Sequence, residues 1–252
     1  MHEKGGTIFA QLVHSGAVSH PCYLDGELPL CPSAINLGEQ VDTPDGFAST
    51  LLPQEYSVEA IKKTLAEYRQ AAAGAKMAGF DGIELHAQLF TLIPQFLSAA
   101  TNQRSDAYGD SIQNRCRIFF EILDKLVSIF PGNKVGVEFT PAAFNNGIIQ
   151  PDEETIDTFA YILGKLNDYD IAFVELVGPR ESLKGTPIAT WEDDFFGWFR
   201  SHFKGTIIAN LGFLAESADD IILQKKAVHI SIGWAATPSR GPNILRIMAC
   251  AH

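Results

Sequence analysis

The stretch that decides the fold covers residues 57–86 and reads SVEAIKKTLAEYRQAAAGAKMAGFDGIELH. Ser57 suits the N-cap of a helix over Val58–Ala78, because its side-chain oxygen can accept a hydrogen bond from a free N–H of the first turn. One face of this helix carries Ile61, Leu65 and Tyr68. Gly79 is a suitable end for the helix, and the apolar run Gly82–Leu85 follows as a short strand. Such a unit is typical of α/β proteins.

The same alternation of short apolar stretches and longer amphipathic ones extends along the chain. It predicts six strands, at Ile8–Val13, Gly82–Leu85, Lys134–Phe139, Ile171–Leu176, Thr206–Ala209 and Val228–Ile232. It predicts helices at Val58–Ala78, Ile112–Phe130, Glu153–Leu166, Trp191–Phe203, Ser217–Gln224 and Pro242–Ala249. The segment of about residues 20–54 is rich in proline and is expected to be a long loop on the functional face. We therefore predict that residues 1–252 form one α/β domain around a parallel sheet.

The composition limits the kinds of partner and ligand that we expect for this chain. The formal net charge is -11 and the chain has no basic run, which argues against a nucleic-acid partner and favours a small-molecule ligand. No apolar run approaches the roughly 20 residues that a membrane span requires. The four cysteines have no CxxC spacing, so we expect a reducing, cytoplasmic setting and no metal site.

Several blocks, in order, resemble the old yellow enzymes, which are flavin-dependent ene-reductases. The first is GTIFAQLVHSG at residues 6–16. The second and longer one includes AGFDGIELH at 78–86, PQFLS at 94–98, TNQRSDAYGDS at 101–111 and NRCR at 114–117. Within it, five polar residues are interpreted as shaping the loop after a strand: Asn102, Arg104, Asp106, Tyr108 and Arg115.

The resemblance implies a TIM (β/α)8 barrel. Because Ile8–Val13 matches the third strand of the family, it also implies a barrel derivative that lacks or replaces the first two βα units. Missing strands would leave unpaired sheet edges, which loops, rearranged pairing or a partner chain must cover. A homo-oligomer covering these edges is one expected solution.

The substrate side of the family's site is partly kept. By resemblance, Gln11 occupies the position that hydrogen-bonds the flavin pyrimidine, and His86 the first position that holds the substrate's carbonyl oxygen. The second oxygen-binding position is Leu89, which cannot donate a hydrogen bond. The position of the family's proton-donating tyrosine is Thr91, whose hydroxyl is far less acidic than a phenol.

The phosphate side departs further. Glu138 stands where the resemblance implies an arginine, Gly233-Trp234 replaces a Gly-Arg pair, and Leu211-Gly212 replaces a glycine pair. Losing cations beside a phosphate weakens its binding, so the sequence predicts no cofactor. If FMN does bind, we expect its contacts to come from Gln11, His86, Gly212 and Gly233.

Two new carboxylates lie near the ends of adjacent predicted strands. Glu138 and Glu175 are predicted to face one cavity as an acid and base pair. An ion pair with a nearby cation such as Arg180 is the alternative. His14 and Trp234 are further candidates for substrate contact, with a solvated loop residue and a filler of the flavin void as the respective alternatives.

The leading functional hypothesis is a flavin-independent enzyme that performs a non-redox isomerisation or cyclisation of a conjugated carbonyl compound. Gln11 and His86 would polarise a substrate oxygen, and Glu138 and Glu175 would move protons. One alternative is an FMN-dependent NAD(P)H ene-reductase whose missing contacts come from another chain. The other is a non-catalytic binding partner of a full-length relative.

Overall fold

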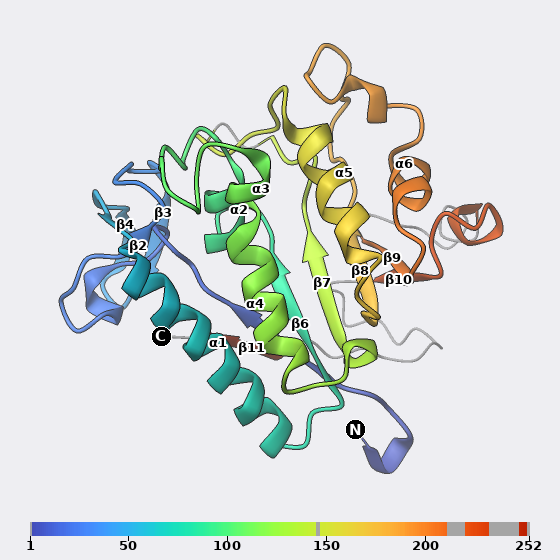
Figure 1. The fold of residues 1–252 in the computed structure, drawn as a ribbon, viewed down its shortest axis with the longest axis horizontal. Helices are drawn as coiled ribbons and strands as arrows, with labels where there is room; N and C mark the ends of the chain where they lie inside the picture. The colour runs from blue at the N-terminus through green and yellow to red at the C-terminus, as the bar shows by residue number, and fades with distance from the viewer. Residues whose placement is uncertain (1, 145–146, 211–219, 232–246, 251–252) are drawn as a thin grey trace.

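The fold is built on one seven-stranded parallel sheet, seen in a computed structural model that describes all residues except 1, 145–146, 211–219, 232–246 and 251–252 (Figure 1). The strand order is β10-β9-β8-β7-β6-β1-β11. The strands are β1 (Phe9–Val13), β6 (Gly82–Ala87), β7 (Val135–Phe139), β8 (Phe173–Val177), β9 (Ile207–Asn210), β10 (His229–Ser231) and β11 (Ile247–Cys250). The six strands predicted from the sequence are confirmed, with small shifts at their ends.

Helices α1, α4 and α5 lie along one face of the sheet (Figure 1). The α-helices are α1 (Val58–Met77), α2 (Leu92–Leu97), α3 (Ile112–Arg115), α4 (Arg117–Val127), α5 (Thr155–Leu166) and α6 (Phe195–His202). Single turns of 3-10 helix occur at η1 (His2–Lys4), η2 (Pro21–Tyr23), η3 (Gly132–Lys134) and η4 (Ala189–Trp191). Within the part of the chain that is described, each helix is too short or too polar to cross a lipid bilayer.

Capping residues set the helix boundaries. Ser57 accepts a hydrogen bond from the Ala60 amide at 3.0 Å and starts α1, as predicted. Gly79, with φ at +86°, ends the turn that follows α1. The helix predicted from Trp191 starts later, at Phe195, because the Asp194 side chain accepts from the Gly197 amide. The helix predicted over residues 112–130 is divided into α3 and α4 by Cys116.

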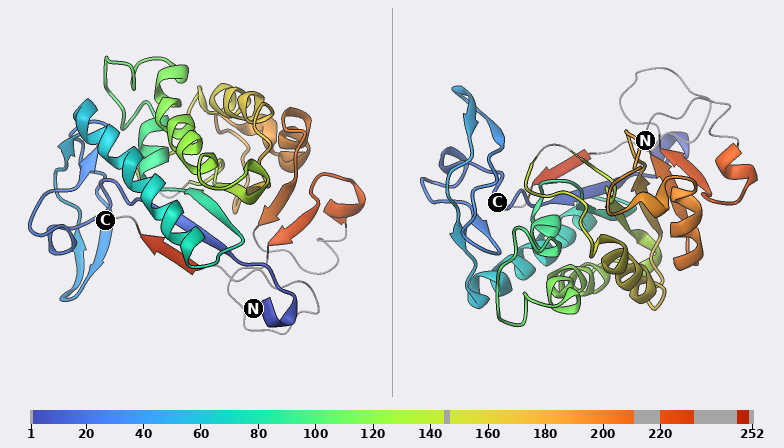
Figure 2. Two further views of the ribbon diagram at one scale, coloured as in Figure 1. Left: turned by 60° about the horizontal axis from the view of Figure 1, so that its bottom comes forward. Right: turned by 90° about the horizontal axis from the view of Figure 1, so that it is seen from above.

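The helix predicted at Pro242–Ala249 is wrong where the structure describes it. Residues 247–250 form β11, which pairs in parallel with β1 from Ala10 to Val13 (Figure 2). The outer edge of β1 offers free backbone N–H and C=O groups, and pairing with them outweighs a weak helical pattern. A segment from late in the chain thus covers one edge of β1. For the predicted helix Ser217–Gln224, residues 220–223 are helical and the start lies outside the described residues.

The segment predicted as a long loop contains short strands. Strands β2 (Leu30–Cys31) and β5 (Gln54–Glu55) pair in parallel, and β3 (Gln40–Thr43) and β4 (Gly46–Ser49) form an antiparallel hairpin. The hairpin turns at Pro44-Asp45, followed by Gly46 with φ at +108°. A Pro-Asp-Gly sequence is a turn signal in its own right, and it marks this hairpin within the proline-rich segment.

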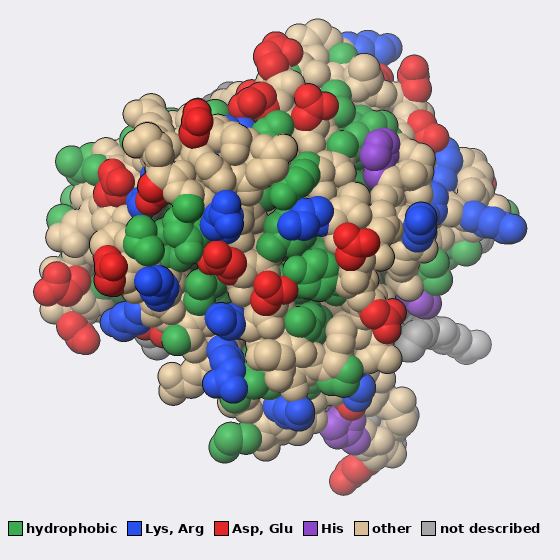
Figure 3. Space-filling model, viewed as in Figure 1, with side chains coloured by type: hydrophobic (Ala, Val, Ile, Leu, Met, Phe, Trp, Pro, Cys, Tyr) green, Lys and Arg blue, Asp and Glu red, His purple; other side chains and the backbone are tan. Residues whose placement is uncertain are grey.

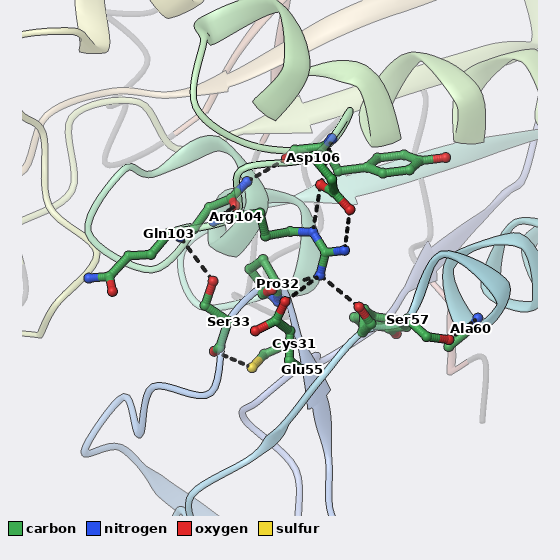
Figure 4. Close-up of polar contacts among 12 residues, drawn as sticks. Cys31, Pro32, Ser33, Glu55, Ser57, Ala60, Gln103, Arg104 and Asp106 are labelled. Carbon is green, nitrogen blue, oxygen red and sulfur yellow. Dashed lines mark hydrogen bonds and ion pairs between the residues drawn. The ribbon is translucent and has the colours of Figure 1, made fainter.

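Arg104 fastens this segment to the loop that follows α2 (Figure 4). Its guanidinium is buried and donates to the carbonyl oxygens of Pro32 and Tyr56, at 3.0 and 2.7 Å. Asp106 and Glu55 balance its charge, with the Asp106 pair bidentate. The interpretation of Arg104 and Asp106 as residues that shape a loop agrees with these contacts.

The outer surface of the helical layer carries both signs of charge. Figure 3 shows Lys and Arg side chains interspersed with Asp and Glu on this face. No single-sign patch dominates the view, so this face lacks the clustered cations that phosphate backbones require.

Candidate active site at the carboxyl ends of the strands

The first side chains on the inner face of the sheet, at the amino ends of the strands, include two aromatic rings, which we call the aromatic floor. The rings of Phe9 on β1 and Phe173 on β8 approach to 5.6 Å between centroids. They fit because the strands between them carry Gly82 and Gly136, where an added Cβ would lie 2.4 Å from the Phe9 ring and 2.3 Å from the Phe173 ring. These two glycines therefore let the floor close between the strands.

A polar layer follows two residues further along each strand, as the alternation of side chains requires. On β1 this layer contains the side-chain amide of Gln11. Its Nε2 donates to Glu84 Oε2 at 2.8 Å and to Glu138 Oε2 at 2.7 Å. Gln11, Glu84 and Glu138 are 3%, 4% and 0% exposed. Carboxylates this deeply buried are stable only with hydrogen-bond donors, and Gln11 supplies one to each of these two.

The second half of the layer is organised in the same way by Asn210 at the end of β9. Its Nδ2 donates to Glu138 Oε1 at 3.3 Å and to Glu175 Oε1 at 2.7 Å. The prediction that Glu138 and Glu175 lie together therefore agrees with the structure, although an amide stands between them. Asn210 was not predicted as a site residue. Its position directly after an apolar run is the sequence signal that could have identified it.

The polar layer presents mainly acceptors to a ligand above it. A carboxamide nitrogen carries two hydrogens, and in both Gln11 and Asn210 these are donated to carboxylates. The carbonyl oxygens of these two amides can therefore accept from a ligand. A ligand that rests on this layer must therefore bring an N–H or O–H group of its own.

The His86 pocket lies beyond this layer, at the carboxyl end of β6. It is lined by Ser15, Val18, His86, Gln88, Leu89, Phe90 and Thr91, and encloses about 490 Å³ of empty space including its mouth. Its cavity volume of about 240 Å³ gives room for a small ligand. The structure thus brings together three of the predicted site residues, His86, Leu89 and Thr91.

Leu89 and Thr91 have both lost the polar role that the resemblance implies for their positions. Leu89 has a positive φ of 42°, a conformation that costs a residue with a Cβ roughly 1–2 kcal/mol. Thr91 donates its hydroxyl to the Gln88 carbonyl oxygen at 2.8 Å. That hydrogen bond stabilises the turn before α2, and it occupies the hydroxyl proton of Thr91.

His14 lies apart from this group, against helix α1. Its Nδ1 accepts from the Gly16 amide at 2.9 Å, so the neutral ring carries its proton on Nε2. The Nε2 atom is 3.3 Å from the Tyr56 hydroxyl, which is 3.2 Å from Thr64 Oγ1. Burial lowers the pKa of His14 to about 4, so the ring is neutral near pH 7.

The predicted residues on the phosphate side, Gly212, Gly233 and Trp234, lie outside the described residues. Among the residues that are described, no group of three or more His, Cys, Asp or Glu side chains is arranged to hold a metal ion. The candidate site therefore consists of the polar layer and the His86 pocket.

Comparison with known proteins gives this site a context. Residues 1–236 match the NADH:flavin oxidoreductase / NADH oxidase family. The Leishmania infantum "Probable flavin mononucleotide-dependent alkene reductase" is 33% identical over 94% of this chain and 64% of its own length. The 12-oxophytodienoate reductase 2 of Arabidopsis thaliana is 30% identical over 92% of this chain and 62% of its own.

Solved structures agree with these matches. Morphinone reductase superposes with a TM-score of 0.81 at 34% identity, over 91% of this chain and 62% of that one. The old yellow enzyme homologue from Zymomonas mobilis superposes with a TM-score of 0.82 at 28% identity, over 92% of this chain and 64% of that one. The predicted barrel-derived α/β fold is thereby confirmed.

These matches correct one expectation. The prediction of no cofactor is wrong, because the matched family is one of flavin oxidoreductases and a relative is named as flavin mononucleotide-dependent. The prediction rested on individual lost cations and gave too little weight to the rest of the chain. This chain spans 62–64% of the length of these relatives. It belongs to the NADH:flavin oxidoreductase / NADH oxidase family, which is the family of the old yellow enzymes.

Proposed function

We propose that this protein is an FMN-dependent alkene reductase that reduces a conjugated carbonyl compound at the expense of NADH or NADPH. The observation that carries the proposal is His86 in a ligand-sized pocket at the carboxyl end of β6, in a chain whose family match covers residues 1–236. Catalytic groups of barrel enzymes lie at this end of the strands. The family match favours a redox reaction over the isomerisation or cyclisation first hypothesised.

The polar layer can bind the imide N–H of the FMN ring but offers no donor from Gln11 or Asn210 to the ring carbonyl groups. The flavin pyrimidine carries an imide N–H, which the carbonyl oxygen of Gln11 can accept. Its two ring carbonyls find no donor in Gln11 or Asn210, because those amide hydrogens are donated to carboxylates. Gln11 would therefore hold neutral flavin by its N–H, with its other contacts made outside this layer.

His86 is the residue we assign to the substrate. When bound, FMN supplies the hydride, and the chain's task is to orient the alkene and polarise its carbonyl group. A hydrogen bond from His86 to the carbonyl oxygen stabilises the negative charge that develops there. Leu89 adds apolar contact but no second donor, so His86 carries the polarisation that two residues share in the family pattern.

The test combines flavin binding with turnover. Purified protein is titrated with FMN, followed by flavin fluorescence, and is then assayed for oxidation of NADH or NADPH with cyclohexenone as substrate. We expect FMN to bind and His86→Ala to lower turnover about 10²- to 10³-fold while FMN binding is kept, as for loss of one oxyanion donor.

His2→Ala is the matched control, because His2 lies in the exposed η1 turn and bonds only to Asp81 among the partners that the structure gives it. It should behave as the wild type in both assays. Failure of the wild-type protein to bind FMN, or turnover that is equal in His86→Ala and the wild type, would remove the proposal.

A further inference from the structure

A second pocket lies between α2 and α5, next to the carboxyl ends of β6 and β7. This α2–α5 pocket has a cavity volume of about 80 Å³ and opens into a cleft of about 640 Å³ that includes its mouth, so a ligand would occupy the cavity with one end and the cleft with the other. Its apolar wall includes Leu89, Pro94, Leu97, Pro141, Ile149 and Phe159. A pocket of this size with mainly apolar walls favours a ligand that is itself largely apolar.

Leu89 belongs to both pockets. It lines the His86 pocket and the α2–α5 pocket, so the two cavities adjoin at its side chain. At this boundary Leu89 has a positive φ, a backbone conformation that is unfavourable for a residue with a Cβ. The rest of the α2–α5 pocket is lined by α2, α3 and α5, by Ala87 at the end of β6 and by the segment that follows β7.

Arg115 supplies hydrogen-bond donors to this pocket. Its side chain is 4% exposed and lines the cavity. It donates to the carbonyl oxygens of Leu97 and Asp110 and to Glu154 Oε2, at 2.9, 2.5 and 2.8 Å. A guanidinium has five N–H groups, so two of them have no partner among the described residues. These two are free to donate to a ligand.

Thr140 adds a second polar group. It lines the pocket at the end of β7, and its Oγ1 is buried with no hydrogen-bond partner in the described part of the chain. Leaving a buried hydroxyl without a hydrogen bond is unfavourable. A ligand oxygen in the pocket would satisfy this hydroxyl, as it would the spare hydrogens of Arg115.

The charged residues around the pocket determine which ligand charge it favours. Arg115 is already paired with Glu154, and Asp152 also lines the pocket. A carboxylate ligand would meet both acidic groups, and a cation would meet the guanidinium. A neutral molecule with a hydrogen-bond acceptor suits the site better than either.

We propose that the α2–α5 pocket is a binding site for a small, neutral, mainly apolar molecule that bears a carbonyl oxygen. The apolar part lies against Leu97, Ile149 and Phe159, and the oxygen accepts from Arg115 or Thr140. Leu89 separates this site from the His86 pocket. Binding here needs neither flavin nor turnover, so it stands or falls separately from the proposed reductase activity.

The test measures the affinity of straight-chain methyl ketones by isothermal titration calorimetry. Because each buried methylene contributes about 0.8 kcal/mol, affinity should rise about threefold to fourfold per methylene from methyl butyl ketone to methyl heptyl ketone. Octanoate, a carboxylate of matching length, should bind more weakly than methyl hexyl ketone. An affinity that does not change with chain length, or tighter binding of octanoate, overturns the proposal.

Substitutions locate the site. Ala143, half-buried in the pocket wall, is replaced by Phe to fill the cavity, and the affinity for methyl heptyl ketone should fall at least about tenfold. The matched control is Ala66→Phe on the exposed face of α1, which should bind as the wild type. Thr140→Val, which removes the hydroxyl at nearly constant size, should weaken binding about twofold to tenfold.

Two further variants keep the outcome decisive. In a His86→Ala background, which removes the carbonyl contact of the reductase pocket, Ala143→Phe should still lower the affinity for methyl heptyl ketone at least about tenfold; complete loss of ketone binding in His86→Ala alone would place the ketone in the His86 pocket and overturn the proposal. If Ala143→Phe does not fold, as judged by circular dichroism, Ile149→Phe fills the same cavity from another side. Wild-type affinity in a folded cavity-filling variant also overturns it.

Discussion

The two faces of strands β6, β7 and β8 differ in what they bury. The outer face presents Ile83, Leu85, Val137 and other apolar side chains, fully buried beneath the helices. The inner face, from the same strands, buries Glu84, Glu138 and Glu175. The outer face stabilises the fold by removing apolar surface from water. The inner face buries mainly polar groups, which their mutual hydrogen bonds keep in place for chemistry.

The largest loss of stability should come from truncating an aromatic side chain that packs against the outer face. Phe119 on α4 is fully buried and packs against Phe139 of β7, with ring centroids 5.5 Å apart. Phe119→Ala removes this contact and leaves a cavity, so the free energy of unfolding should fall by about 3–5 kcal/mol. Urea denaturation measures it.

Phe47→Ala is the control for this truncation. Phe47 lies on β4 with 79% of its surface exposed, so its loss should change the free energy of unfolding by less than about 0.5 kcal/mol. Equal losses in the two variants would show that the outer face does not carry the stability assigned to it.

A smaller effect should come from His14, a polar residue on the helical side of the sheet. Burial lowers its pKa from 6.5 to about 4 in the folded protein, so the unfolded chain takes up a proton first as the pH falls. The stability associated with neutral His14 is present above its unfolded pKa and is lost as the pH falls towards 4. The loss from about pH 7 to about pH 4.5 should be about 2–3 kcal/mol.

The measurement compares the wild type with His14→Asn, which keeps an acceptor for the Gly16 amide and does not titrate. Free energies of unfolding are determined for both proteins across this pH range. The wild type should lose more stability than the variant on acidification. Parallel curves would mean that His14 has the same proton affinity in the folded and unfolded states.

A comparable test applies to the polar layer. Gln11→Leu leaves Glu84 and Glu138 without the amide that donates to both, so the free energy of unfolding should fall by about 1–3 kcal/mol. Gln103→Leu is the control, because the Gln103 side chain is exposed. Thermal and urea denaturation of the two variants give the comparison. An unchanged stability of Gln11→Leu would mean that the layer does not depend on this bridge.

The outer face was predictable from the sequence because its signal is local. Apolar periodicity and capping residues such as Ser57 placed α1 and its neighbouring strand within one or two residues. The β3–β4 hairpin was missed although its Pro44-Asp45-Gly46 turn signal is equally local. Strand β11 was missed because pairing with β1, more than 230 residues earlier by the printed numbering, decided its conformation.

The inner face was only partly predictable, since its contacts join residues far apart in sequence. Gln11 and Glu138 are 127 residues apart and nevertheless share a hydrogen bond. The family resemblance singled out Gln11, His86 and Glu138 one by one. It gave no reason to connect Asn210 with them, because that link depends on how β7, β8 and β9 stand in register.

The smallest effect should come from the boundary between the two pockets, where Leu89 has φ at +42°. Leu89→Gly and Leu89→Ala remove almost the same apolar contacts, but only alanine keeps a Cβ in the left-handed region. The glycine variant should therefore be more stable than the alanine variant by about 1 kcal/mol. On α1, where Ala66 is helical and exposed, Ala66→Gly should instead destabilise by about 1 kcal/mol. Opposite signs at the two positions are expected in thermal denaturation; a glycine penalty at both would show that Leu89 is not held in a strained conformation.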